Sequence, residues 1–176
     1  RAADGTLYAA SQEVVDNSLV SALYTVNASD WSMTAIGGRQ ELGYTDMSWA
    51  PTTNGGSLMA VYGNYAMVVD TATGAYLGAW DLTSYLGSAT AVALTFVQTQ
   101  ADSTYGLYDL FLMMDSNGVV YQTGFAYDAS TGKYTIFKPA ALLQVPNVYN
   151  TFYGSSMYCE NGVVFISALS AQGETL

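Results

Sequence analysis

Short runs in which apolar and polar residues alternate follow one another along this chain of 176 residues. The runs are rich in Tyr, Val, Leu and Thr, and Gly, Asn or Asp interrupts them about every 8 to 12 residues, a spacing typical of all-β proteins. The pattern predicts about thirteen strands. They are expected at Thr6 to Ser11, Ala22 to Asn27, Ser32 to Gly37, Tyr44 to Ala50, Ser57 to Tyr62, Tyr65 to Asp70, Ala75 to Asp81, Ala91 to Gln98, Gly106 to Met114, Val119 to Tyr127, Lys133 to Lys138, Thr151 to Cys159 and Val163 to Leu169.

Helical periodicity is weak throughout the sequence. The one stretch that could form a helical turn runs from Lys138 to Gln144, and Pro139 and Pro146 limit it because proline interrupts helices. We therefore predict an all-β fold.

Three hairpins share one pattern, in which an apolar strand is followed by an Asx residue, three small or polar residues and a turn position. The Asx side chain can accept bonds from backbone N–H groups of the turn, and a glycine at the turn position readily adopts a positive φ. We assign a structural turn role to Asn27, Asp70, Gly74, Asp128 and Gly132. Trp31 replaces the glycine in the first copy, so that turn is expected to differ.

The Asx residues of the three copies lie about 43 and 58 residues apart, close to the period of about 40 to 45 residues in a four-stranded propeller blade. We predict a β-propeller-like region of about three and a half blades, with approximate limits 1–43, 44–90, 91–150 and 151–176. The first blade would lack its first strand and the last would be truncated, so we expect a fragment whose open edges are covered by the remainder of a parent chain or by another copy. A β-sandwich built from the same strands is the alternative.

Each Asx hairpin follows a shorter strand that opens after a turn, as in Gly5 to Tyr8, Gly56 to Met59 and Tyr105 to Tyr108. This combination resembles the degenerate β-propeller repeats of secreted and cell-wall-attached surface proteins of Gram-positive bacteria. The resemblance covers nearly the whole chain, and Trp31 and the long third unit depart from it. It implies an extracellular or cell-wall-attached repeat region and no particular ligand.

The composition excludes several classes of function. Only 4 residues are Lys or Arg against 14 Asp or Glu, which gives a net charge of -10 and disfavours nucleic acids and anionic membranes as partners. No apolar run reaches the roughly 18 residues that a membrane span needs, so no membrane insertion is expected. The chain has no histidine, which removes Ser-His-Asp catalysis and imidazole metal sites. We expect no catalytic residue, no metal site and no cofactor.

Candidate ligand-binding residues come from loops that one face of a propeller would share. These loops are Gln12 to Ser21, Gly38 to Gly43, Gly63 to Asn64, Leu82 to Thr90, Asp115 to Gly118 and Pro139 to Asn150. The candidates are Asp16, Asn17, Arg39, Tyr85, Asp115 and Asn117, together with Trp31, which is expected to be exposed in its turn. Glu13, Glu41 and Tyr149 lie in the same loops.

A glycosidase needs two carboxylates about 5 to 10 Å apart. The possible members of such a pair are Glu13 with Asp16, Asp102 with Asp109, and Asp46, which would face a neighbouring blade. None has a distinguishing sequence context. We therefore predict an extracellular, non-catalytic recognition or scaffold module that binds protein or glycan. The alternatives are part of a carboxylate-dependent glycosidase or lyase of propeller fold, and an accessory domain of a large surface protease.

Overall fold

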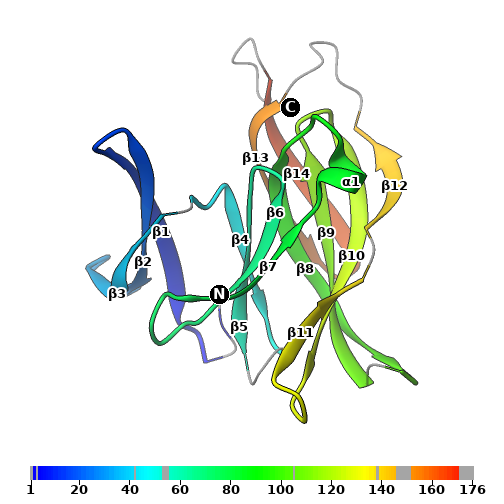
Figure 1. Cartoon of the computed structure of the whole chain (residues 1–176), viewed down its shortest axis with the longest axis horizontal. Coiled ribbons are helices and arrows are strands. Elements are labelled where there is room, and N and C mark those ends of the chain that lie inside the picture. The colour runs from blue at the N-terminus through cyan, green and yellow to red at the C-terminus, as the bar shows by residue number, and fades with distance from the viewer. Residues whose placement is uncertain are drawn as a thin grey trace.

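The computed structural model describes residues 2, 4–41, 43–52, 56–104, 106–137, 139–145 and 152–170. In this part of the chain fourteen strands and one short helix form an all-β structure of four antiparallel sheets, none of them closed into a barrel (Figure 1). Tyr149 lies outside the described residues, as do the other residues of the range 146–150 at the end of the predicted loop from Pro139 to Asn150.

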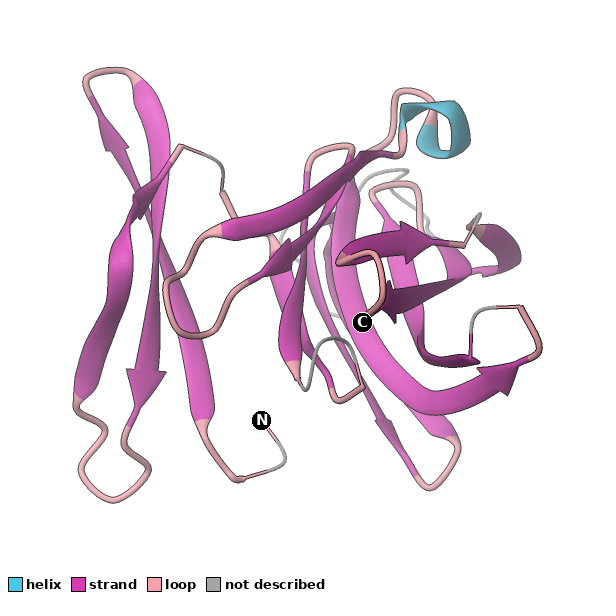
Figure 2. Cartoon of the chain, turned by 60° about the horizontal axis from the view of Figure 1, so that its bottom comes forward, coloured by secondary structure: helices cyan, strands magenta, loops and turns pink. Residues whose placement is uncertain are grey.

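The strands of each sheet follow one another along the chain. The first sheet consists of β1 (Leu7–Val15), β2 (Ser18–Val26) and β3 (Met33–Gln40), and the second of β4 (Asp46–Ala50), β5 (Ser57–Tyr62), β6 (Tyr65–Val69) and β7 (Tyr76–Asp81). The third sheet consists of β8 (Ala91–Asp102), β9 (Gly106–Asp115), β10 (Val119–Asp128), β11 (Lys133–Ile136) and β12 (Ala140–Gln144), and the fourth of β13 (Phe152–Glu160) and β14 (Val163–Ser170). The helix α1 (Thr83–Leu86) connects β7 to β8 (Figure 2). At four residues, it is the one helix described, so no described helix is long and apolar enough to cross a membrane.

Three apolar clusters hold the sheets together in chain order. Leu23 and Ile36 of the first sheet pack against Met67 and Val69 of the second. The opposite face of the second sheet packs against one face of the third, where Phe111 and Phe125 are fully buried and meet edge to face at 5.4 Å. The other face of the third sheet packs against the fourth through residues that include Met114 and Met157. Successive sheets therefore stack face to face, because alternate side chains of each strand point to opposite faces.

Two predictions about local structure are wrong. Gln12 to Ser21 was expected to be a loop, but β1 and β2 continue through it to a two-residue turn in which Asp16 and Asn17 adopt φ of 50° and 63°. Two successive residues with positive φ match the right-handed twist of the flanking strands, so the hairpin needs no longer loop. The segment from Lys138 to Gln144 was expected to turn helically, but its residues 140–144 form β12, whose backbone groups pair with β10.

The three Asx hairpins make the same turn, including the one that contains Trp31. The side chains of Asn27, Asp70 and Asp128 accept bonds from the backbone N–H two residues later, at 2.7 to 3.0 Å. The N–H four residues later bonds to the Asx carbonyl at 2.8 Å in every copy. Trp31 has φ 59°, close to the 71° and 67° of the glycines in the other copies. The expectation of a different first turn is therefore wrong, because Trp31 accepts the left-handed conformation instead.

Close backbone contact joins the first two sheets. A Cβ on Gly37 of β3 would lie 1.7 Å from the carbonyl oxygen of Thr73, and one on Gly74 would lie 2.9 Å from the carbonyl oxygen of Ile36. Both glycines also have positive φ. The Asx turn of the second sheet therefore rests directly on the backbone of β3, which only glycine permits.

Side chains of β4 bind the backbone of β8. The Asp46 carboxylate accepts bonds from the N–H groups of Leu94 and Met47, both at 2.8 Å, and the Ser48 hydroxyl accepts one from the N–H of Phe96 at 2.8 Å. Asp46 thus faces a neighbouring sheet. Burial raises the pKa of Asp46 to about 6, although the bonds from Leu94 and Met47 oppose that shift.

Replacing Trp31 with glycine is expected to stabilise the protein. The left-handed conformation costs a non-glycine residue about 1 to 2 kcal/mol. The greater conformational entropy of glycine in the unfolded chain reduces the gain in stability by about 0.5 to 1 kcal/mol. The ring of Trp31 is 72% exposed, so its removal sacrifices little packing. Urea denaturation of Trp31→Gly should show a gain of about 0.5 to 1 kcal/mol. The matched variant Gly132→Ala should show a loss of similar size, since its turn is open around the new methyl group. A destabilised Trp31→Gly variant would contradict this account.

The stability of the protein should fall as the pH rises from 3.8 to about 6. In this range the folded protein retains a proton on Asp46 that the unfolded chain has lost, since the folded pKa is about 6 and the ordinary value is 3.8. The contribution of Asp46 to the free energy of unfolding is complete below pH 3.8 and is lost as the pH rises through 6. It amounts to about 3 kcal/mol. Urea denaturation at a series of pH values should show this component in the wild type and its disappearance in Asp46→Asn.

The control for the pH series is Asp128→Asn. Hydrogen bonds from Ser130 and Thr131 lower the pKa of Asp128 to about 2. The contribution of Asp128 to the free energy of unfolding is therefore present above pH 3.8 and is lost as the pH falls through 2. Stability here decreases as the pH falls, which is the opposite of the Asp46 effect. This variant should lower the stability by a constant amount above about pH 4 and should alter the slope of the profile only below that pH. Equal slopes above that pH in the wild type and in Asp46→Asn would refute the assignment.

Candidate functional site

A groove of about 300 Å³ opens on the third sheet, where its outer strand is interrupted. The strands β11 and β12 both pair with β10, the first along its end and the second along its beginning. Between them, the N–H of Phe137 still bonds to the carbonyl of Gly124 at 2.8 Å, and the Thr123 hydroxyl donates to the carbonyl of Phe137 at 2.9 Å. Pro139 has no N–H with which to continue the ladder, so the chain leaves the sheet edge here.

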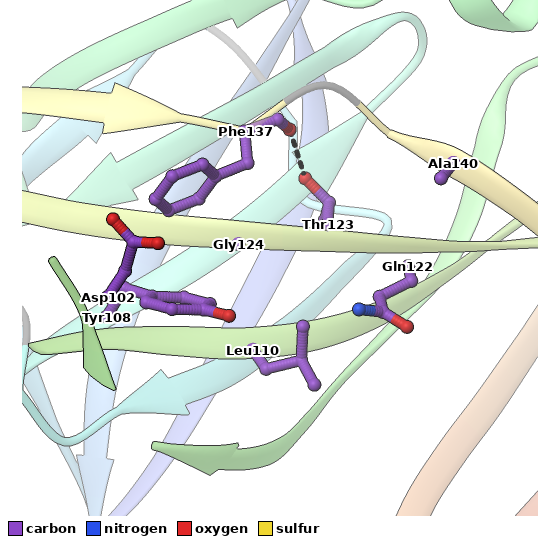
Figure 3. Close-up of a pocket in the computed structure, with 8 residues that line it drawn as sticks. All are labelled: Asp102, Tyr108, Leu110, Gln122, Thr123, Gly124, Phe137 and Ala140. Atoms are coloured by element: carbon purple, nitrogen blue, oxygen red, sulfur yellow. Dashed lines mark hydrogen bonds between the residues drawn. The ribbon is translucent and has the colours of Figure 1, made fainter. Parts of the chain in front are cut away.

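Two aromatic rings form one end of the groove. The rings of Tyr108 and Phe137 lie 4.8 Å apart between centroids (Figure 3). They meet over the backbone of Gly124, since a Cβ there would lie 2.5 Å from the ring of Phe137 and 3.0 Å from that of Tyr108. Any side chain at position 124 would push the rings apart. The hydroxyl of Tyr108 also donates to the side-chain oxygen of Gln100, which fixes the orientation of its ring.

Side chains from four strands line the rest of the groove. The carboxylate of Asp102 lies beside Tyr108 and Phe137, whereas Gln122 and Leu110 line the other end (Figure 3). The carboxylate accepts a bond from the N–H of Thr104 at 2.7 Å, which anchors it at the β8–β9 turn. Asp102 is the single charged residue among the described residues that line the groove. The groove therefore offers apolar ring surface next to one acidic acceptor and one amide.

The groove lies on the same face of the third sheet that the fourth sheet covers further along. Tyr108 and Leu110 in the groove alternate with Asp109 and Phe111, which face the second sheet. On the groove side β9 continues to Met114, which packs against the fourth sheet. The groove is thus bordered by the interface between the third and fourth sheets.

The predicted ligand residues of the first sheet lie at its two ends. Asp16 and Asn17 form the exposed turn between β1 and β2, and near it Arg39 is held by an ion pair with Glu13 at 2.5 Å. Trp31 occupies the turn between β2 and β3 at the opposite end of the hairpin. The structure therefore does not bring Trp31 together with the other candidates of this sheet.

Asp115 has a structural position in its turn. It is buried, and its carboxylate accepts bonds from the N–H groups of Asn117 and Val119 at 2.9 Å and from the hydroxyl of Tyr121 at 3.1 Å. Burial and the nearby carboxylate raise the pKa of Tyr121 to about 12. This geometry disagrees with a ligand-binding role for Asp115, because its oxygens bind the protein itself.

The loops of the second and third sheets meet near α1. The N–H of Leu82 bonds to the carbonyl of Asn64, and the N–H of Ser116 to that of Thr90. Tyr85 of α1 and Asn117 belong to these loops, whereas the tip between β1 and β2 lies at the other side of the molecule (Figure 1). The predicted loop face is therefore divided into separate regions.

Among the described residues that line the groove, Asp102 has no second carboxylate beside it. Asp109 is fully buried and accepts bonds from the N–H of Thr52 and the hydroxyl of Thr99, both at 3.0 Å, so it faces away from Asp102. Glu13 is engaged by Arg39, and Asp46 by the backbone of β8. Among the described residues no group of three or more His, Cys, Asp or Glu side chains could hold a metal ion.

The sequence reasoning missed Tyr108, Gln122 and Phe137. They fall inside segments that read as ordinary strands, where an aromatic or amide side chain gives no sign of which face it occupies. Two signals were present, since Gly124 interrupts a strand and Pro139 follows one. A glycine within a strand marks a close approach of other atoms, which here are the two rings.

Comparisons with known proteins add little to this picture. No protein-family model matches the chain, and no curated protein matches its sequence. Among solved structures, the crystal structure of Saccharomyces cerevisiae Sqt1 is similar with a TM-score of 0.48 and 10% sequence identity. The similarity covers 96% of this chain and 57% of that one, so the chain spans little more than half the length of Sqt1. At this distance the similarity indicates no function.

Proposed function

We propose that the chain is a non-catalytic recognition module that binds a glycan in the groove of the third sheet. The observation that carries the proposal is the pair of rings, Tyr108 and Phe137, held 4.8 Å apart beside the carboxylate of Asp102 and the amide of Gln122. Sugar rings have apolar C–H faces and hydroxyl edges, so they suit a site that combines aromatic surface with hydrogen-bonding groups.

The charge of the site favours neutral ligands over anionic ones. Asp102 is the single charged residue that lines the groove in the part of the chain that the structure describes, and the chain as a whole carries -10. An anionic ligand would meet repulsion from both. The volume of about 300 Å³ is at the small end of ligand sites, which fits one short segment of a glycan.

The geometry favours binding over hydrolysis. A glycosidase requires an acid and a second carboxylate across the scissile bond, and the groove contains one carboxylate. Asp46 has the raised pKa that a general acid needs, but one of its oxygens accepts a bond from the N–H of Leu94 in β8 and the other from the N–H of Met47 in its own strand. The enzymatic alternative therefore lacks an assembled pair in the described part of the chain.

We further propose that the fold is β-propeller-like and that the protein acts outside the cell or attached to its wall. Four antiparallel sheets in chain order, each stacked on the next, support the propeller, although a sandwich of stacked sheets shares these features. A chain with few Lys residues and a surface rich in Ser, Thr and Tyr supports the location.

Glycan binding can be tested with a glycan array and by titration calorimetry with the sugars that the array identifies. Tyr108→Ala and Phe137→Ala should each weaken binding by about fivefold or more, because they remove a stacking surface worth at least about 1 kcal/mol. Asp102→Asn should weaken binding less than either ring variant. We expect no hydrolysis of the glycan by the wild type or by this variant. The melting temperature of each variant shows that the fold is retained.

The matched control is Tyr85→Ala, which removes an exposed tyrosine of α1 outside the groove. It should bind as the wild type does. Loss of binding in Tyr85→Ala but not in Tyr108→Ala would place the ligand on the loop face and overturn the groove. Turnover of a bound glycan that Asp102→Asn abolishes would instead establish the enzymatic alternative.

A further inference from the structure

A second pocket, of about 260 Å³, lies where the four sheets meet. Its lining comes from the first strand of every sheet, β1, β4, β8 and β13, and from Leu58 of β5. Among the residues that these four strands contribute are, in that order, Tyr8, Trp49, Thr95 and Tyr158. None of the described residues that line the groove of the third sheet belongs to this pocket. The pocket therefore results from the packing of the sheets against one another and is a site separate from the groove.

Contacts between the strands fix the walls of the pocket. The hydroxyl of Ser48 accepts a bond from the N–H of Phe96 at 2.8 Å, which ties β4 to β8. The ring of Trp49 lies nearly parallel to that of Tyr8, with 6.1 Å between centroids and an angle of 8° between the planes. A Cβ on Gly56 would lie 2.3 Å from the ring of Trp49, so the backbone also touches the indole. A pocket whose walls are held in this way loses little conformational entropy when a ligand binds.

The lining of the pocket is mainly apolar and uncharged. Among the described residues that form it, none is Asp, Glu, Lys or Arg. Leu58, Leu94 and Met157 are buried, whereas Tyr158 is 53% exposed and marks the side nearest to solvent. A charged ligand would lose its hydration here without gaining a partner of opposite charge, which is costly. The lining therefore favours a neutral ligand with a large apolar surface.

The indole of Trp49 has an unused hydrogen-bond donor. Its Nε1 is buried and has no hydrogen-bond partner among the described residues. Buried N–H groups in proteins are nearly always paired, and an unpaired one lowers stability. Because Trp49 lines the pocket, an oxygen atom of a bound molecule can supply the missing acceptor.

We propose that this pocket binds a small, neutral and mainly apolar molecule that carries a carbonyl or hydroxyl oxygen as the acceptor for Trp49. The rings of Tyr8 and Trp49 provide surface for a flat or aromatic part of the ligand. The volume limits the ligand to about one or two rings. A sugar would have to give up water at several hydroxyl groups among leucine and methionine side chains, so this pocket disfavours the glycan that we propose for the groove.

The proposal can be tested by equilibrium dialysis with two probes of nearly the same shape, neutral 2-acetylnaphthalene and anionic 2-naphthoate. The wild type should bind one equivalent of 2-acetylnaphthalene saturably and 2-naphthoate about tenfold or more weakly, because the pocket offers no partner for a charge. Tyr158→Ala should weaken the binding of 2-acetylnaphthalene by about threefold or more, since it removes part of the wall. The melting temperature of each variant shows that the fold is retained.

Trp49→Phe tests the hydrogen bond, because it keeps an aromatic ring and removes the N–H. It should weaken the binding of 2-acetylnaphthalene by about threefold or more. It should affect 2-ethylnaphthalene, which lacks the oxygen, by a clearly smaller factor. An equal effect on both probes would overturn the bond to Trp49 that the proposal requires.

The matched control is Tyr108→Ala, which removes a ring of the groove and should bind 2-acetylnaphthalene as the wild type does. In turn, Trp49→Phe should bind the glycan as the wild type does, so failure of this proposal and failure of the glycan proposal are distinguishable. A wild-type chain without saturable binding of 2-acetylnaphthalene, or with equal affinity for 2-naphthoate, overturns the proposal. Loss of binding in Tyr108→Ala but not in Trp49→Phe overturns it as well, because the probe then occupies the groove.

Discussion

Burial of the second sheet on both faces is the constraint on which the rest of the structure depends. Every residue of β5 from Ser57 to Val61 and of β6 from Ala66 to Val69 is buried. One set of alternate side chains meets the first sheet and the other set meets the third. The central strands β5 and β6 therefore have no exposed side between Ser57 and Val61 and between Ala66 and Val69, so they are nearly continuous apolar runs, and the neighbouring sheets must supply matching apolar faces. The hydrogen bonds that Asp46 and Ser48 accept from the backbone of β8 then fix how the third sheet is placed against the second.

Backbone conformation limits the structure at a few points where side chains do not. The contact between the turn at Gly74 and the strand at Gly37 brings two backbones together without intervening side chains. The groove depends on the same principle, since Tyr108 and Phe137 meet only because Gly124 has no Cβ. Trp31 is the converse case, because a large residue there adopts the left-handed conformation that glycine adopts at the same position of the other two Asx turns.

Most strand positions were predictable from the sequence because most strands are short runs of alternating or continuous apolar residues that Gly, Asn or Asp interrupts. The strands of the first hairpin were predicted too short, since residues such as Glu13 and Gln12 are exposed and read as loop. The strand β12 was missed because Pro139 precedes it and its residues are apolar but exposed. The groove could not be predicted, since it arises where β11 and β12 share the edge of β10, and pairing between segments that are distant in sequence leaves no local pattern.

The order of the strands has a consequence for how the chain reaches this structure. Apart from β12, every strand pairs only with its immediate neighbours in sequence, and the Asx turns close three of the hairpins through bonds within five residues. Such short loops cost little entropy to close, so each sheet can form as soon as its own residues have left the ribosome. The second sheet would then remain half-covered until the third has been synthesised, and that interval is when its apolar strands are most at risk of aggregation.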